Sequence, residues 1–122
     1  IFATANETNA LLVPEMPDYI EHAFYKCYVY VKPEKLKPDW DRDRIIEAVN
    51  QCNVPCFSGS CSEVYLEKAF DNSGFRPALP LANAVSLGER SLMFLVHPTL
   101  SEDEISRTCE ALKGVMLQAS IS

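Results

Sequence analysis

The residues best suited to chemistry gather in residues 53–65, which read NVPCFSGSCSEVY. This segment holds two of the chain's five cysteines, Cys56 and Cys61, and three serines around a single glycine. Thiolates bind zinc or act as nucleophiles, whereas serine hydroxyls and turn amides can contact an anion or a sugar. Four interpretations are therefore open at this point: a metal clip, a nucleophile, a ligand-binding loop and a plain turn.

The cysteine spacing does not favour the metal or the nucleophile. A structural zinc site needs two close pairs of ligands, but Cys52, Cys56 and Cys61 form a single loose cluster. A cysteine nucleophile needs a nearby base, and neither His22 nor His97 comes with a recognisable partner motif. We therefore expect no catalytic residue and no metal site here, and we interpret the cysteines as small, reduced, mostly buried thiols.

The serines fit a ligand-binding loop better than a catalytic motif. The G-x-S-x-G order of a nucleophile elbow is absent, because Gly59 is the only glycine nearby, and no Gly-Lys-Ser/Thr follows as in a phosphate-binding Walker loop. A turn of small residues remains, whose amides and hydroxyls could face an anion or a sugar, particularly if Ser62 caps a helix. A plain turn stays the alternative.

The hydrophobic pattern predicts the elements that carry this segment. Along residues 24–31 (FYKCYVYV) the side chains alternate as in a strand, with Val29 on one face and Tyr28 and Tyr30 on the other. The predicted order is a strand over 24–31, a helix over 42–52 capped by Asp39 or Asp41, a strand over 54–57, a short helix or turn over 62–70, a loop over 71–80, a helix over 81–90 and a strand over 91–96.

The last helix has the strongest local signal. Ser101 stands three residues before Glu104, which is the spacing of a capping box. An apolar stripe then follows at helical spacing, and Gly114 beside it predicts close packing. The stripe consists of Ile105, Cys109, Leu112, Met116 and Ala119.

Composition limits the class of protein. The 122 residues suffice for one domain, which we place at 19–122 after a lead-in over 1–18. A net charge of −6 without a basic stripe argues against nucleic acid and against an anionic membrane as partners, and no apolar run could span a bilayer. The odd number of cysteines suits a cytoplasmic protein. The chain begins with Ile1 instead of Met, which leaves a longer parent chain open.

Four stretches carry a family resemblance: HAFYKCYVYV, WDRDRIIEAV with its helix, NVPCFSGSCSEVYLEKAF and LPLANAVSLGERSLMFLVHPTLSEDEI. Together they resemble the C-terminal small domain of the DegT family of pyridoxal phosphate-dependent sugar aminotransferases, from about Leu11 to Ala119. The last stretch is the most specific, because the family similarly ends a strand on His-Pro and opens its final helix with an acidic cap. The matching residues here are His97-Pro98 and the cap at Ser101.

The resemblance implies a fold and an activity. The fold is α+β with two layers, a mostly antiparallel sheet of three or four strands with helices on one face, as in the C-terminal domain of fold-type-I pyridoxal phosphate-dependent transferases. The parent enzyme would be a homodimer that transfers an amino group, typically from glutamate, to a nucleotide-linked keto sugar for surface polysaccharide or lipopolysaccharide. In that family the cofactor-binding lysine lies in a preceding large domain. We therefore expect this fragment to bind no pyridoxal phosphate and to contribute substrate contacts and domain closure.

The resemblance also marks the serine-rich loop. The family carries a His-Tyr-Pro run and a later His near the substrate, and a gap-free alignment places these on residues 59–61 and on Tyr65, where all four residues differ. We predict that the position of the loop is shared while its chemistry is not. The residues predicted to offer hydroxyls to a sugar nucleotide are Ser58, Ser60, Ser62 and Tyr65.

Two other classes need no missing domain. One is a stand-alone α+β module that binds a small ligand or has a regulatory role, and the other is a cysteine-based thiol or metal protein.

Overall fold

Four short strands form one antiparallel sheet in a computed structural model that describes residues 1–121. Their order across the sheet is β1–β2–β4–β3. In the central pair, Cys27 of β2 lies opposite Phe94 of β4, and Tyr30 lies opposite Ser91. The bounds of the strands are Leu11–Leu12 for β1, Cys27–Val31 for β2, Cys56–Phe57 for β3 and Ser91–Phe94 for β4.

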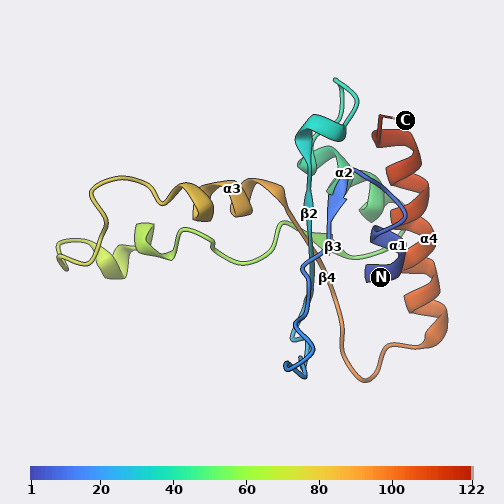
Figure 1. Cartoon of the computed structure of the whole chain (residues 1–122), viewed down its shortest axis with the longest axis horizontal. Helices are drawn as coiled ribbons and strands as arrows, with labels where there is room; N and C mark the ends of the chain where they lie inside the picture. The colour runs from blue at the N-terminus through green and yellow to red at the C-terminus, as the bar shows by residue number, and fades with distance from the viewer. Residues whose placement is uncertain (122) are drawn as a thin grey trace.

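Helices α1 (Phe2–Ala5), α2 (Arg42–Gln51) and α4 (Glu102–Ala119) cover one face of the sheet (Figure 1). The core lies between these two layers, where Val29 and Phe94 from the sheet meet Ile45 of α2 and Leu112 of α4, all fully buried. Burial of such side chains is the main stabilising term of the fold. This arrangement confirms the predicted α+β class. Within residues 1–121, no helix is both long and apolar enough to cross a membrane.

Local signals explain where the elements begin. The Asp41 carboxylate accepts a hydrogen bond of 2.7 Å from the Arg44 amide, so Asp41 caps α2 and Asp39 does not. At α4 the predicted capping box is present, with Ser101 and Glu104 bonded in both directions. The strand predicted from residue 24 begins only at Cys27, because Phe24 has a positive φ of 44° that breaks the extended chain.

The predicted stripe of α4 is buried in its second half only. Leu112, Met116 and Ala119 belong to the core, whereas Ile105 keeps 42% of its surface exposed. Ile105 lies over a hollow formed with α1 and the segment after β4, so the first turns of the helix have less to pack against. The close packing predicted at Gly114 is wrong, because a Cβ placed there would meet no atom within 4 Å.

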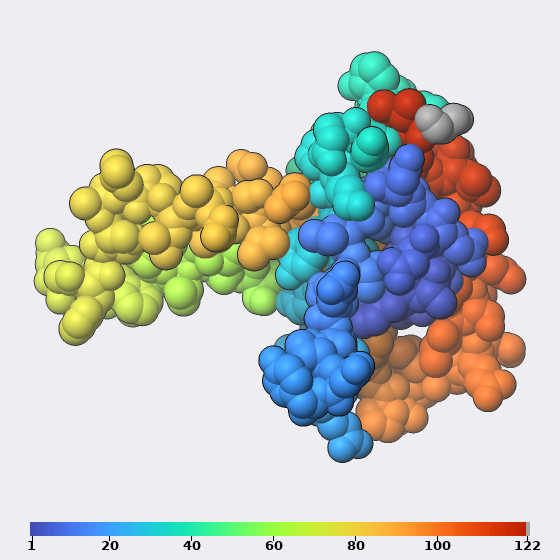
Figure 2. All heavy atoms as spheres, in the orientation of Figure 1, coloured from blue at the N-terminus to red at the C-terminus, as the bar shows by residue number. Residues whose placement is uncertain are grey.

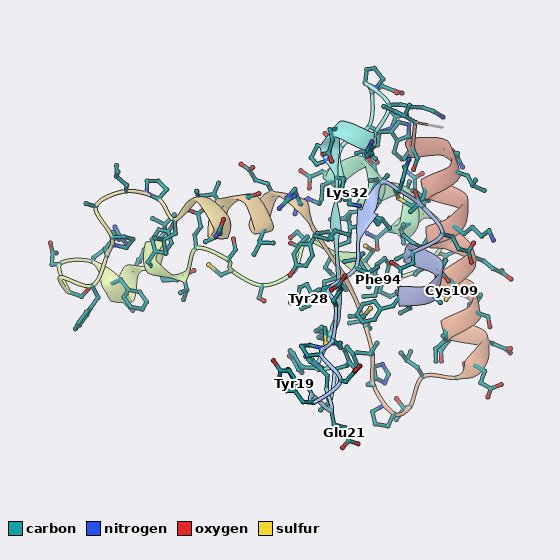
Figure 3. The ribbon with its side chains drawn as sticks, viewed as in Figure 1. Tyr19, Glu21, Tyr28, Lys32, Phe94 and Cys109 are labelled. Atoms are coloured by element: carbon teal, nitrogen blue, oxygen red, sulfur yellow. The ribbon has the colours of Figure 1, made fainter. Side chains whose placement is uncertain are left out.

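Part of the segment predicted as a lead-in over 1–18 packs into the core. Ala5 and Ala10 have no exposed surface, and Leu11 of β1 pairs with Val31 of β2. The segment thus supplies a helix and an edge strand. Residues 13–26 then leave the body as a loop, and Figure 3 shows Tyr19 and Glu21 far from the core.

Residues 58–90 form a long projection, here called the arm, which leaves the body after β3 and returns into β4 (Figures 1 and 2). The outgoing limb contains the 3-10 turns Val64–Leu66 and Lys68–Phe70, and the returning limb is α3 (Ala82–Arg90). A third 3-10 turn, Pro33–Lys35, lies in the body. The arm brings its two limbs side by side at its root, next to the face of β2 that α2 and α4 leave uncovered.

Candidate functional site

An open pocket of about 790 Å³ lies at the root of the arm, and we call it the arm pocket. Its walls come from β2, from the outgoing limb, from α3 and from the first residue of β4. The polar groups on these walls are hydroxyls, one side-chain amide and the Cys61 thiol, and no lining residue carries a charge. The residues that line the pocket are Tyr28, Tyr30, Ser60, Cys61, Ser62, Leu81, Ala82, Asn83, Ala84, Leu87 and Ser91.

Strand alternation places the two tyrosines in this pocket. Successive side chains of a strand point to opposite faces of the sheet, so buried Val29 faces the helices while Tyr28 and Tyr30 face the arm. Figure 3 shows Tyr28 on the arm side of the sheet and Phe94 between the sheet and α4. Both tyrosines are half-buried and line the pocket.

The turn after β3 places Gly59 against the Tyr28 ring and Ser60 beside the Tyr28 hydroxyl. Gly59 has a φ of +97°, and a Cβ at this position would come within 2.8 Å of Cε1 of Tyr28. Only glycine adopts such a conformation without strain and leaves room for the ring. The hydroxyls of Tyr28 and Ser60 are then 3.0 Å apart and form a hydrogen bond.

Contacts at Ser62 and Ser91 hold the outgoing limb against α3 and β4. The Ser91 hydroxyl donates to the carbonyl of Ser58, which ties the beginning of β4 to the outgoing limb. A Cβ on Gly88 would overlap the Ser62 hydroxyl, so the absence of a side chain at Gly88 lets the limbs approach closely. Both contacts shape the wall of the pocket that carries Ser60 and Ser62.

Tyr65 lies beside the pocket, with 8% of its surface exposed. Its hydroxyl donates a hydrogen bond of 2.6 Å to the Glu63 carboxylate and accepts one of 3.0 Å from the Leu81 amide. The bond to Glu63 raises the pKa of the Tyr65 hydroxyl, since the carboxylate stabilises the protonated form. A tyrosine has one hydroxyl proton, and that of Tyr65 is already donated to Glu63 within the arm.

The structure keeps the three predicted serines together and sets Tyr65 apart. Ser60 and Ser62 line the arm pocket, and Ser58 and Tyr65 do not. Ser58, Ser60 and Ser62 together line a neighbouring hollow that also includes Arg42. Sequence reasoning missed Tyr28, Tyr30, Asn83 and Ser91 as pocket residues. The alternation of β2 signals that the tyrosines point away from the core, but nothing local shows that the arm returns opposite them.

The cysteines do not assemble into a centre. All five thiols are free, and among residues 1–121 no three His, Cys, Asp or Glu side chains lie close enough to hold a metal ion. Burial raises the pKa of Cys27 to about 11 and that of Cys56 to about 12. Cys61 lines the pocket, and desolvation together with a hydrogen bond to Glu67 raises its pKa. A protonated thiol is a weak nucleophile.

No protein-family model matches the chain, and no curated protein matches it either. Among solved structures, it is similar to an aminotransferase from Psychrobacter cryohalolentis, with 51% sequence identity and a TM-score of 0.89 over 97% of this chain and 32% of that one. A DegT DnrJ EryC1 StrS aminotransferase from Brucella abortus shares 20% identity, with a TM-score of 0.70 over 93% of this chain and 28% of that one.

The sugar aminotransferase CalS13 from Micromonospora echinospora shares 19% identity, with a TM-score of 0.68 over 92% of this chain and 27% of that one. At these lower identities the likeness shows the fold alone. The chain spans about a third or less of the length of the aminotransferases it matches.

Proposed function

We propose that this chain is the C-terminal small domain of a pyridoxal phosphate-dependent aminotransferase of the DegT family, which transfers an amino group from glutamate to a nucleotide-linked keto sugar. The observation that carries the proposal is the 51% identity to an aminotransferase over 97% of this chain. The names of the two more distant structures, a DegT-type and a sugar aminotransferase, support the choice of family and substrate. The parent enzyme is a cytoplasmic homodimer that serves surface polysaccharide or lipopolysaccharide synthesis.

The chemistry of the arm pocket supports a sugar as its ligand. A sugar is neutral and carries many hydroxyls, each of which can donate and accept a hydrogen bond. The pocket offers the matching groups, namely the hydroxyls of Tyr28, Ser60 and Ser62 and the amide of Asn83, and no lining residue is charged. The tyrosine rings add apolar surface on which a sugar ring can pack.

In this proposal the chain binds and orients the sugar while the cofactor is held elsewhere. No lysine lines the arm pocket, so its residues do not fit covalent attachment of pyridoxal phosphate. The cofactor, when bound to the parent enzyme, carries the amino group between donor and acceptor. Ser60 and Ser62 contact the sugar directly. The roles of Ser58 and Tyr65 as ligands stay predictions, because their positions lie outside the wall that faces the pocket.

The tip of the arm also suits a place inside a larger enzyme. Phe75 and Leu79 are 81% and 78% exposed, although both are large and apolar. Exposed apolar surface of this kind tends to be covered by other protein. In the proposal the rest of the parent chain covers it when the domains close over the substrate.

The test is an assay of amino transfer in the full-length protein that contains this chain. Glutamate is the donor, and keto sugars linked to uridine or thymidine diphosphate are the acceptors. We expect the double variant S60A/S62A to raise KM for the nucleotide sugar about tenfold, because two hydrogen bonds are lost. The matched control is S106A, which removes an exposed hydroxyl of α4.

The outcomes separate the two parts of the proposal. If the unmodified protein transfers no amino group to any nucleotide-linked keto sugar, the proposed aminotransferase function is contradicted. Transfer with an unchanged KM in S60A/S62A leaves the function standing and contradicts the assignment of the arm pocket. A KM raised equally by S106A contradicts that assignment too, since Ser106 lies outside the pocket.

A further inference from the structure

Helix α2 holds both limbs of the arm at its root. Arg42, its first residue, donates through Nη1 to the carbonyl of Gly88 at 3.0 Å and lies 3.4 Å from the carbonyl of Ser91. Near the other end of α2, the Asn50 side chain donates to the Cys56 carbonyl at 2.9 Å and accepts from the Cys56 amide at 3.1 Å. Arg42 therefore fastens the returning limb, and Asn50 fastens the strand from which the outgoing limb departs.

Arg42 is the first residue of α2, where a positive charge does not stabilise the helix. A positive charge is unfavourable at the N-terminus of a helix and favourable at a C-terminus, where the last carbonyls lack partners. The Arg42 side chain, only 18% exposed, is bonded to Asp43 at 2.5 Å and reaches the C-terminal end of α3. Besides the ion pair with Asp43 in its own helix, Arg42 thus makes a hydrogen bond to α3, at a residue 46 positions further along the chain.

Arg44 offers a direct contrast within the same helical turn. Its guanidinium pairs with Asp39 at 2.9 Å and stacks over the Trp40 ring at 4.5 Å, and its side chain is 49% exposed. These contacts remain within the segment around α2. The two arginines have the same chemistry and nearly the same place in the sequence, but only Arg42 reaches the arm.

Moving α3 would change the width of the arm pocket. The first turn of α3 forms one wall, and Ser60 and Ser62 on the outgoing limb form another. The outgoing limb touches α3 at Ser62 and Gly88, and it touches the first residue of β4 at Ser58 and Ser91. Arg42 bonds the carbonyls of Gly88 and Ser91, the residues that the outgoing limb meets at these two contacts. We propose that Arg42 is the positioning residue of the arm pocket, which fixes α3 against the outgoing limb and so sets the geometry in which Ser60 and Ser62 meet a ligand.

Amide hydrogen exchange in the full-length protein tests the structural step without any substrate. We expect R42A to speed exchange of α3 amides about tenfold to a hundredfold, since hydrogen bonds from a charged donor are lost. The amides of α4 should exchange as before, which shows that the body remains folded. R42K should fall between R42A and the unmodified protein, because lysine keeps the charge but not the planar, multi-donor guanidinium.

R44A is the matched control, and it should leave α3 exchange unchanged. The proposal is overturned if α3 in R42A exchanges within twofold of the unmodified protein, or if R44A speeds it as much. It is also overturned if α4 loses protection together with α3, because Arg42 would then hold the whole fold.

Kinetics test the link to the pocket, and this step rests on the proposed function. We expect R42A to raise KM for the nucleotide-linked keto sugar at least fivefold while KM for glutamate stays within twofold, with partial rescue in R42K. Faster α3 exchange with an unchanged KM for the sugar overturns the positioning role. The proposed function is judged separately, by whether the unmodified enzyme transfers an amino group at all.

Discussion

The Tyr28 and Ser60 hydroxyls lie 3.0 Å apart, so a hydrogen bond joins the outer face of β2 to the loop that follows β3. The bond connects residues separated by 32 positions in the sequence, and both of them line the arm pocket. One group belongs to the rigid sheet and the other to the arm. Together with the bond from the Ser91 hydroxyl to the Ser58 carbonyl, this contact holds the loop against the sheet, and it can be removed by a single substitution.

Tyr28→Phe removes this bond and keeps the ring. We expect the free energy of unfolding to fall by about 0.5–1 kcal/mol, the usual contribution of a neutral hydrogen bond at an exposed site. Urea denaturation of the chain measures the change. Tyr19→Phe is the control, because Tyr19 is 87% exposed and its hydroxyl faces solvent. An equal loss in both variants would mean that the bond to Ser60 contributes nothing.

Gly59→Ala should destabilise the chain by more than Gly74→Ala. Both glycines have positive φ, +97° and +76°, so alanine is strained at either position. Only at Gly59 would the new methyl also meet a ring, 2.8 Å from Tyr28, whereas nothing lies within 4 Å at Gly74. We expect losses of about 2–3 kcal/mol at Gly59 and about 1 kcal/mol at Gly74 from urea denaturation. Equal losses would contradict the close approach to the ring.

Gly114→Ala should stabilise the chain. Gly114 lies inside α4, and a Cβ there meets no atom within 4 Å. Alanine is favoured over glycine in a helix by about 0.5–1 kcal/mol, so the thermal midpoint should rise by a few degrees. A lower thermal midpoint in the variant would show that Gly114 is closely packed, as the sequence predicts and the structure does not.

Elements with a local signal could be predicted from the sequence. The alternation in β2, the Asp41 cap and the Ser101–Glu104 capping box each lie within a few residues, and the structure confirms all three. The strand β1 could not be predicted in the same way. It contains only two residues, too few for a period to show, and it forms because Leu11 can pair with Val31.

The arm pocket depends on contacts that no local pattern encodes. The residue types of Ser60 and Ser62 predict a role in binding, but the wall opposite them comes from α3, which begins some twenty residues later. The bond from Arg42 to Gly88 spans 46 residues. Tyr65 aligns with a histidine of the family, but its hydroxyl donates to Glu63, only two residues away. The carboxylate two positions before Tyr65 is visible in the sequence and indicates such a local bond.

Thiol reactivity should divide the five cysteines into classes. Burial raises the pKa of Cys27 to about 11 and that of Cys56 to about 12, so at pH 8 only about one thiol in a thousand and one in ten thousand is ionised. The exposed thiols, Cys52 and Cys61, should react first with a disulfide reagent such as dithionitrobenzoate. In guanidinium chloride all five should react alike. Rapid reaction of Cys56 in the folded chain would contradict its burial.

The capping box of α4 should make stability depend on pH through Glu104. Its carboxylate accepts hydrogen bonds of 2.8 Å from both the amide and the hydroxyl of Ser101, and the bond from the amide is the main cause that lowers the pKa of Glu104 below 4.5. A carboxyl group with a lowered pKa in the folded state stabilises it above the unfolded pKa, and this contribution is lost as the pH falls through the folded value. Glu104→Gln tests this dependence, because it keeps an acceptor oxygen but removes the charge.

The thermal midpoints of E104Q and the unmodified chain should therefore differ most at pH 6–7 and converge near pH 3. Glu102→Gln is the control, since Glu102 lies in the same first turn outside the capping box and its effect is limited to the helix dipole. A difference between E104Q and the unmodified chain that stays constant from pH 7 to pH 3 would show that the Glu104 charge plays no part in the cap.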